Sequence, residues 1–395
     1  MSLYLVCPPG LEPAVAEEAE ELLGVPVQPG QGGVDAPGDM VDAAGLCLWA
    51  RTPSRVLLVL GEVRAASLQQ LEQELRKLDW SPIVHPGQEV KVRVGGRGRI
   101  KHHGAAGDKV SHAINDALRG PQRGGNPRGG NPRGGRGAPR GRGRPPGRGA
   151  PPQRGRGPAL PPLELSLRLD ERIARISLDA GGLLHKRGYR LASAKAPIRE
   201  NLAASLLRMA GWRPGVPLVD PMCGAGTFSI EAGLWSADLP PSGQVPAVTQ
   251  LPGFPAGAWE QMLQEAHQSQ GDPLEAPIWT ADRDPGACRV TQENASRAGL
   301  HIAPACKDIG EPFAAPPQGT GLVVLNPPYG KRVADNVKLA PLYRKIGSSL
   351  RAQFPGWRVA VVCPDKALAG RIAKMNELCR FSNGGINVGI YVGTL

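Results

Sequence analysis

The sequence lacks the features that mark membrane, secreted and zinc-binding proteins. Its start, MSLYLVCPPG, has no basic segment and no long apolar run, and the run at 56–60 holds five apolar residues, against the roughly 20 that span a bilayer. The seven cysteines are odd in number and form no CxxC or Cys/His spacing, which argues against a disulfide framework and a metal site. We therefore expect a cytoplasmic protein with no membrane and no metal partner.

Aromatic residues are also scarce, at 4% of a chain that holds 53 Gly and 41 Pro, so part of the chain is not expected to pack a core. That part is the segment 119–157, in which 39 residues include 11 Arg, 14 Gly and 8 Pro and no acidic residue. Its charge of +11 accounts for nearly all of the net charge of +12. The other residues, enough for two or three domains, are nearly neutral.

The basic segment carries a short repeat, RGGNP at 123 and at 128, followed by RGG at 133. Gly and Pro oppose regular structure and like charges repel, so we expect disorder. One interpretation is a passive linker. Guanidinium groups also pair with phosphates and stack on unpaired bases, so the favoured interpretation is RNA contact by arginines such as Arg123, Arg128 and Arg133.

Apolar patterning returns on both sides of the basic segment. Alternating leucines at 163–169, a turn at 170–172 and alternating apolar residues at 174–178 predict a β-hairpin with one buried face. Before the segment, the pattern predicts a strand at 89–94 and a helix at 108–118. The basic segment is therefore expected to be an insertion within a small α/β domain.

From Pro197 onward, helices alternate with short apolar strands, which predicts a mainly parallel, doubly wound sheet. A closing hairpin is expected at the end, with a turn at 383–385. The predicted strands are 216–219, 278–281, 321–325, 359–363, 378–381 and 386–392, and the predicted helices are 201–210, 227–235, 286–298 and 339–354.

A glycine-containing turn, DPMCGAGT at 220–227, follows the first of these strands and leads into a helix. An acid, a glycine turn and a helix N-terminus can cradle a ligand that approaches the backbone closely, although a tight strand-to-helix turn is the simpler alternative. The turn lacks GxGxxG and the Lys of a phosphate loop, so a nucleoside without phosphates is favoured over a dinucleotide or an NTP. The residues assigned to this cradle are Asp220, Pro221, Cys223, Gly224, Gly226 and Thr227.

Two further acids are candidates for the same ligand. Asp282 ends the second strand, where its carboxylate could accept hydrogen bonds from both hydroxyls of a ribose. Asp284, followed by Pro285, is instead expected to cap the next helix. Asp308, farther along, could accept from an adenine amino group or could be a solvated loop acid.

The strand at 321–325 ends in Asn326, Pro327, Pro328 and Tyr329, at the edge where open α/β sheets bind ligands. The motif could be no more than a rigid turn. Its chemistry nevertheless suits an aromatic amine, because the Asn326 side-chain oxygen and the Pro327 carbonyl can both accept from one NH2 group while Tyr329 stacks on the base. Two such acceptors would aim the nitrogen lone pair at an electrophile and stabilise the charge that develops on it.

Together, DPMCGAGT, Asp282 and NPPYG resemble the class I S-adenosylmethionine-dependent amino-methyltransferases. The helix segment APIRENLAASLL is similar to one branch of these enzymes. The chain also resembles the THUMP-containing large-subunit ribosomal RNA guanine-N2 methyltransferases, through QGGV at 31–34, LHKRGYR at 184–190 and GFPAGAW at 253–259. This resemblance extends over almost the whole chain except the basic segment.

This resemblance implies an α/β protein: a ferredoxin-like unit at 1–60, a THUMP RNA-binding domain at 61–190 interrupted by the basic insert, and a Rossmann-like methyltransferase domain at 191–395. It implies that the cradle and Asp282 bind the methionine part and the ribose of S-adenosylmethionine, and that Asp308 binds its adenine. The NPPY residues would hold the target guanine of 23S-type RNA. Lys186, Arg187 and Arg190 would be fixed RNA contacts.

The sequence departs from the family in two ways: the insert splits THUMP, and the second methyltransferase domain of some members is absent, so at most one methylation is expected. NPPY also occurs in DNA amino-methyltransferases and in protein glutamine methyltransferases. Transfer-RNA guanine-N2 methyltransferases share the architecture and remain an alternative. A non-catalytic RNA chaperone or ribosome assembly factor that uses the arginine tract is a third possibility.

Overall fold

The computed structural model describes residues 1–119, 160–190, 198–269, 271, 277–313, 319–329, 336–383 and 385–395. Arg123, Arg128 and Arg133 lie outside these ranges, so their assignment to RNA stays a prediction. The chain divides into two compact units: a larger one, Met1–Glu62 with Arg175–Leu395, and a smaller one, Val63–Ala174. No helix among the described residues is both long and apolar enough to cross a bilayer.

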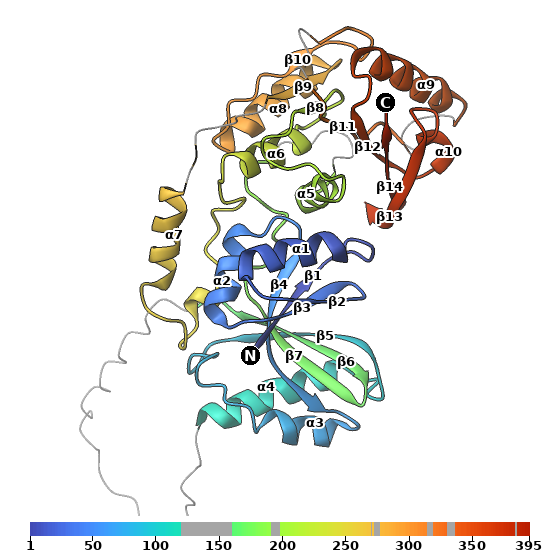
Figure 1. Ribbon diagram of the computed structural model, residues 1–395. Helices are drawn as coiled ribbons and strands as arrows, with labels where there is room; N and C mark the ends of the chain where they lie inside the picture. Colours follow the sequence, from blue (N-terminus) through green and yellow to red (C-terminus); the bar gives the residue numbers. More distant parts are fainter. Residues whose placement is uncertain are drawn as a thin grey trace, which may run out of the picture. The chain divides into compact units, whose positions relative to one another are not determined.

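The N-terminal part of the larger unit is a βαββαβ arrangement (Figure 1). Its strands are antiparallel and lie in the order β2-β3-β1-β4, which is the ferredoxin-like arrangement that the resemblance implies. Asp39 begins α2 with a capping box. The elements are β1 (Ser2–Val6), α1 (Glu12–Leu23), β2 (Gln28–Gly30), β3 (Gly33–Pro37), α2 (Met40–Trp49) and β4 (Arg55–Arg64).

The smaller unit contains α3 (Leu68–Leu75), β5 (Val90–Gly98), α4 (His103–Arg119) and β6 (Leu163–Glu171). β5 and β6 are parallel, and α4 packs against β5 and α3. The predicted strands at 89–94 and 163–169 and the predicted helix at 108–118 are confirmed, and the alternating leucines of β6 are buried. The strand predicted at 174–178 is β7 (Ile173–Asp179); Ala174, Ile176 and Leu178 are buried as expected, but Ser177 between them is buried as well.

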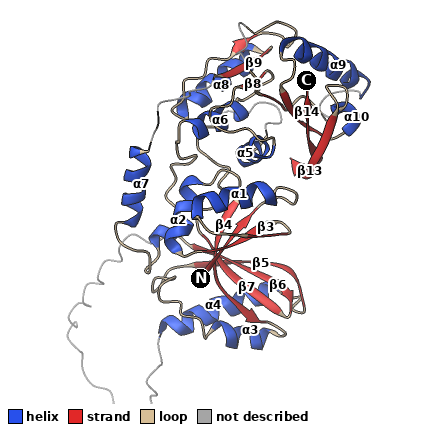
Figure 2. Ribbon diagram, viewed as in Figure 1, coloured by secondary structure: helices blue, strands red, loops and turns tan. Residues whose placement is uncertain are grey.

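The second sheet, in the larger unit, has the strand order β10-β9-β8-β11-β12-β14-β13, with the strands labelled in Figure 1 and coloured red in Figure 2. All its strands are parallel except β14, which runs antiparallel to β12 and to β13. The doubly wound sheet and the closing hairpin are therefore confirmed. Its strands are β8 (Leu218–Asp220), β9 (Ile278–Asp282), β10 (Ala305–Cys306), β11 (Leu322–Leu325), β12 (Arg358–Cys363), β13 (Met375–Asn383) and β14 (Ile386–Thr394).

Helices cover this sheet on both faces because its central strands are apolar throughout. α9 (Asn336–Gln353) and α10 (Lys366–Ala369) pack on one face, where Tyr343, Ile346 and Leu350 meet alternate residues of β8, β11 and β12. α6 (Thr227–Ser236) packs against β8, β9, α5 (Glu200–Met209) and α8 (Pro285–Arg297). The larger unit also contains α7 (Ala258–Gln268), and neither α7 nor the short α10 was predicted.

Candidate functional site

The order in which successive strands join the sheet reverses between the parallel strands β8 and β11, and ligands bind at such a point in open α/β sheets. From β8 the chain proceeds to β9 and β10 on one side, and β11 and β12 extend the sheet on the other. Asp220 ends β8, Asp282 ends β9, and Asn326 follows β11. The topology therefore brings these three predicted site residues to one edge of the sheet.

The glycine turn after β8 is fixed by hydrogen bonds from α8. Thr291 Oγ1 donates to the carbonyl of Gly224 (3.0 Å), and Asn294 Nδ2 donates to that of Ala225 (3.0 Å). Gly226 begins α6 with φ 78°, and a Cβ there would lie 2.6 Å from the Thr291 side chain, so only glycine fits. A Cβ at Gly224 would meet no atom within 4 Å, which leaves that side of the turn open to a ligand.

Asp220, the acid of the turn, is buried, with 1% of its surface exposed. Its Oδ2 accepts from Ser229 Oγ (3.1 Å), which in turn accepts from Thr280 (2.8 Å). Oδ1 is buried and has no hydrogen-bond partner among the described residues. Burial, reinforced by the nearby Asp282, raises the pKa of Asp220 to about 7. A buried carboxyl oxygen without a hydrogen-bond partner among the described residues is suited to a ligand that is cationic or donates a hydrogen bond.

Asp282 connects the ends of β8 and β9. Its Oδ2 accepts from the backbone N–H of Gly224 (3.0 Å), and its Oδ1 accepts from that of Asp284 (3.0 Å). Both oxygens keep lone pairs for further donors, as a ribose diol requires. Asp284 caps α8 through Gly286 N (2.8 Å), with Pro285 at the first position, as predicted.

Asp308 lies after β10 and is committed to loop contacts in this structure. Its Oδ1 accepts from Lys345 Nζ (2.6 Å) and from Gly310 N (2.9 Å), and 36% of the side chain is exposed. The Lys345 ammonium holds the pKa of Asp308 below its usual range. These contacts do not test whether Asp308 binds adenine, so that assignment stays a prediction.

The NPPY residues follow β11 directly. Asn326 is half-buried, and its Oδ1 is a second buried side-chain acceptor without a partner among the described residues. Pro327 is buried and Pro328 is exposed. The Tyr329 hydroxyl accepts from Asn383 Nδ2 (3.0 Å), and burial raises the pKa of the phenol. An unpaired acceptor next to an oriented aromatic ring is suited to a planar amine.

The prediction that Arg187 is an RNA contact is wrong. Its side chain is 1% exposed and donates to the carbonyls of Leu184 (2.6 Å) and Arg51 (2.5 Å), beside the carboxylate of Glu231 (3.4 Å). Arg190 is also held internally, in an ion pair with Glu200 (2.6 Å), whereas Lys186 is exposed. A buried, paired guanidinium stabilises the fold and cannot reach a phosphate.

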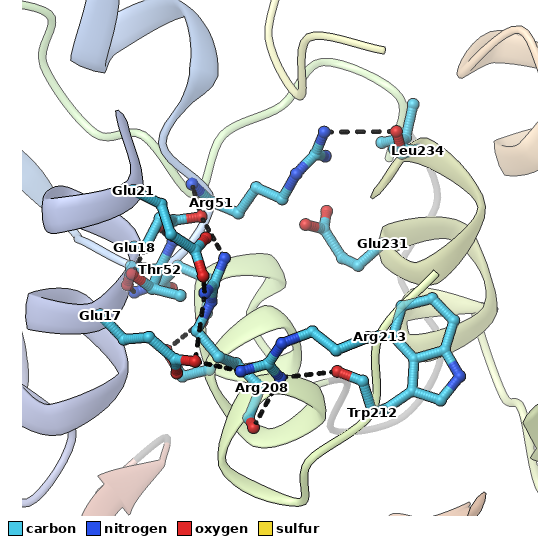
Figure 3. A network of polar contacts seen from close by, with 12 residues as sticks. Glu17, Glu18, Glu21, Arg51, Thr52, Arg208, Trp212, Arg213, Glu231 and Leu234 are labelled. Atoms are coloured by element: carbon cyan, nitrogen blue, oxygen red, sulfur yellow. Dashed lines mark hydrogen bonds and ion pairs between the residues drawn. The ribbon is translucent and has the colours of Figure 1, made fainter. Parts of the chain in front are cut away.

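Arg187 is part of a buried polar network that joins the ferredoxin-like elements to α6, as Figure 3 shows for its neighbours. Arg51 donates to the carbonyls of Leu234 (3.2 Å) and Leu239 (2.7 Å), at the C-terminal end of α6. Its own backbone N–H donates to Glu18 of α1 (3.0 Å). A cation at this end of α6 complements the helix dipole, so the network steadies the helix that begins at the glycine turn.

Several residues that position the site were not predicted from the sequence. They come from elements that are distant in the chain, and their side chains are common core or turn polar groups. These residues are Arg51, Ser229, Thr280, Thr291, Asn294 and Asn383.

The strand order, the glycine turn after the first strand and the acid after the second define a class I methyltransferase, the fold of S-adenosylmethionine-dependent enzymes. The chain belongs to the family described as RMKL-like methyltransferase domain, whose model matches residues 187–388. Residues 2–57 match a second model, the RlmL ferredoxin-like domain.

Relatives and solved structures agree with this assignment. A putative RNA methyltransferase of Synechocystis sp. is 32% identical over 383 residues, covering 95% of this chain and 92% of its own. A ribosomal RNA large subunit methyltransferase K/L of Chromohalobacter salexigens is 32% identical over 407 residues, covering 97% of this chain and 51% of its own. This chain therefore spans about half the length of the K/L relatives.

Among solved structures, a putative methyltransferase complexed with SAH is similar with a TM-score of 0.80 and 24% identity, covering 99% of this chain and 97% of the other. A possible methylase from Clostridium difficile 630 has a TM-score of 0.81 and 23% identity, with the same coverage. These likenesses show that the fold is shared over nearly the whole length of the chain.

Proposed function

We propose that this protein transfers a methyl group from S-adenosylmethionine to the exocyclic N2 amine of a guanine in large-subunit ribosomal RNA. The observation that carries the proposal is the buried Oδ1 of Asn326, which has no hydrogen-bond partner within the described part of the chain, at the sheet edge it shares with Asp220 and Asp282. The printed names of the relatives, an RNA methyltransferase and ribosomal RNA large subunit methyltransferases, favour RNA as the carrier of that amine.

The residues around the glycine turn fit the cofactor. The unpaired Oδ1 of Asp220 would accept from the ammonium of the methionine part, and the open side of Gly224 would let that part lie against the backbone. Asp282 would accept from the ribose hydroxyls, and Pro221, Cys223, Gly226 and Thr227 would complete the cradle. When bound, S-adenosylmethionine supplies the electrophilic methyl group.

Asn326 and its neighbours would make the amine nucleophilic. The lone pair of an aromatic amine is delocalised into the ring, so the amine reacts slowly unless its hydrogens are held out of the ring plane. The Asn326 oxygen and the Pro327 carbonyl would accept those two hydrogens, and Tyr329 would stack on the base. The methylated nitrogen is strongly acidic, so no dedicated base is needed.

For RNA binding, we propose that the THUMP domain expected at 61–190 includes the smaller unit, Val63–Ala174, and that the outer face of β5 and β6 contacts phosphates. The side chains of Lys91, Arg93 and Arg97 are exposed at alternating positions on β5, away from α4. Arg99, just after β5, and Arg168 on β6 are exposed as well. Lys91 and Arg93 have acidic neighbours at 4.0 and 2.9 Å, whereas Arg97, Arg99 and Arg168 have no ion pair within the described ranges. Free guanidinium groups are suited to phosphate contact.

The reaction is tested by supplying labelled S-adenosylmethionine with protein-free 23S-type RNA, assembled large subunits or transfer RNA, and identifying the product nucleoside by mass spectrometry. We expect N2-methylguanosine in the 23S-type RNA. A base must be unpaired or flipped to reach Asn326, so protein-free RNA should be the better substrate. Label found only in transfer RNA, or recovered as methyladenosine, would replace this substrate with another.

A non-catalytic assembly factor is the remaining alternative. Such a protein would bind RNA without needing the buried acceptors of Asp220 and Asn326. Titration with S-adenosylmethionine in a calorimeter separates the two functions, because the proposed enzyme binds the cofactor and a vestigial site does not.

A further inference from the structure

Asn383 is a polar residue of the closing hairpin that reaches the site from a distant part of the chain. It ends β13, is 8% exposed, and pairs in the hairpin with Ile386 of β14. Its side-chain amide donates to the hydroxyl of Tyr329 at 3.0 Å, across 54 residues of sequence. Among the described residues, Asn383 is the side chain that forms a hydrogen bond with the Tyr329 hydroxyl.

Tyr329 needs such support because the motif fixes its backbone but not its ring. Pro327 and Pro328 restrict the chain before it. The ring itself turns about two side-chain bonds, and its stacking geometry depends on both. A hydrogen bond at the hydroxyl, the atom farthest from the backbone, holds the ring at its outer end.

We propose that Asn383 is a positioning residue of the methyl-transfer site, which holds the ring of Tyr329 in the orientation that stacks on the target base. The proposal rests on the proposed function, in which Tyr329 contacts the base. It adds the antiparallel hairpin to the parallel strands that build the site. Asn383 touches neither amine nor cofactor and acts through Tyr329 alone.

The expected effect is on turnover more than on RNA affinity. Without the hydrogen bond, the ring must be ordered as the base enters, and the loss should lower kcat about threefold to tenfold. The KM for RNA should change less than about twofold, because phosphate contacts elsewhere supply most of the affinity. Cofactor affinity should not change.

The test is a double-mutant cycle with Tyr329→Phe, which keeps the ring and removes the hydroxyl. We expect Asn383→Ala and Tyr329→Phe to lower kcat by similar factors, and Asn383→Ala to have less than about a twofold effect in the Tyr329→Phe background. Asn383→Leu keeps the branching and the number of side-chain heavy atoms, so it leaves no cavity, and it should behave in the same way, which separates the lost hydrogen bond from a cavity.

Asn376→Ala is the matched control, since Asn376 is an exposed asparagine of the same strand, and it should keep wild-type kcat. Equal losses from Asn383→Ala in both backgrounds, or no loss in the wild-type background, would overturn the proposal. Tyr329→Ala and the wild-type chain separate the two levels. Wild-type turnover in Tyr329→Ala would show that the ring has no part in the site and would refute the role of Asn383, and an inactive Tyr329→Ala with an additive cycle would also refute that role. An absence of methyl transfer by the wild-type chain would instead refute the proposed function.

Discussion

The substitution Asp220→Asn should stabilise the cofactor-free protein while weakening its binding of S-adenosylmethionine. Asp220 is 1% exposed; its Oδ2 accepts from Ser229, and its Oδ1 has no hydrogen-bond partner among the residues that the structure describes. Burial raises its pKa from 3.8 to about 7. A buried carboxylate that lacks a hydrogen-bond donor destabilises the folded protein, and a ligand that supplies the donor removes that cost.

The magnitude follows from the pKa. Each pKa unit is worth about 1.4 kcal/mol, so ionised Asp220 destabilises the folded chain by about 4 kcal/mol above pH 7. Folding raises the pKa of Asp220, so the carboxyl group imposes no penalty on the free energy of unfolding below pH 3.8, where it is protonated in both states. The penalty grows as the pH rises from 3.8 and is complete above about 7. Asparagine carries no charge, so its advantage over aspartate should grow across that window.

Urea denaturation at several pH values measures this effect. We expect the difference in free energy of unfolding between Asp220→Asn and wild type to increase by about 2 to 3 kcal/mol from pH 5 to pH 8. Asp108→Asn, at an exposed carboxylate, is the control and should show no such trend. Calorimetry should show cofactor binding weakened about 10- to 100-fold by Asp220→Asn. A difference in stability that stays constant with pH would refute the reasoning.

Three further substitutions test other parts of the structure. Asn326→Ala should lower kcat by about 10² to 10³ with cofactor affinity unchanged, measured by labelled methyl transfer and calorimetry, while Asn376→Ala stays active. Arg97→Glu should weaken RNA binding and flatten its salt dependence, measured by filter binding at several salt concentrations. Lys77→Glu, at an exposed lysine in the turn after α3 that is already paired with Glu74, should do neither. Arg51→Leu should cost about 2 to 4 kcal/mol of stability in urea, because the carbonyls at the end of α6 lose a buried donor; an unaffected midpoint would exclude that role.

The parallel sheet was predictable because its strands are short, apolar and separated by helices of ordinary length. The site lies where strands end, so the acids and the NPPY residues could be placed from their position after each strand. α7 was missed although Trp259, Met262, Leu263 and Ala266 recur at the i, i+3, i+4, i+7 spacing of an amphipathic helix.

The contacts that position the site depend on distant parts of the chain. Arg187 lies in a run of basic residues and was therefore assigned to RNA, but its carboxylate partner, Glu231, comes 44 residues later. One signal was present: Glu231 interrupts an otherwise apolar, buried helix, and such an acid needs a buried donor. Asn383 carried no comparable signal, because an asparagine beside two glycines is also typical of a turn.

The most direct test of the account is to measure methylated nucleosides in 23S ribosomal RNA from a strain that lacks this protein, complemented with the wild-type chain or with Asn326→Ala. The account predicts one N2-methylguanosine that is absent from the deletion strain, returns with the wild-type chain and does not return with the variant. Restoration by the variant, or a lost nucleoside that is a methyladenosine, would contradict it.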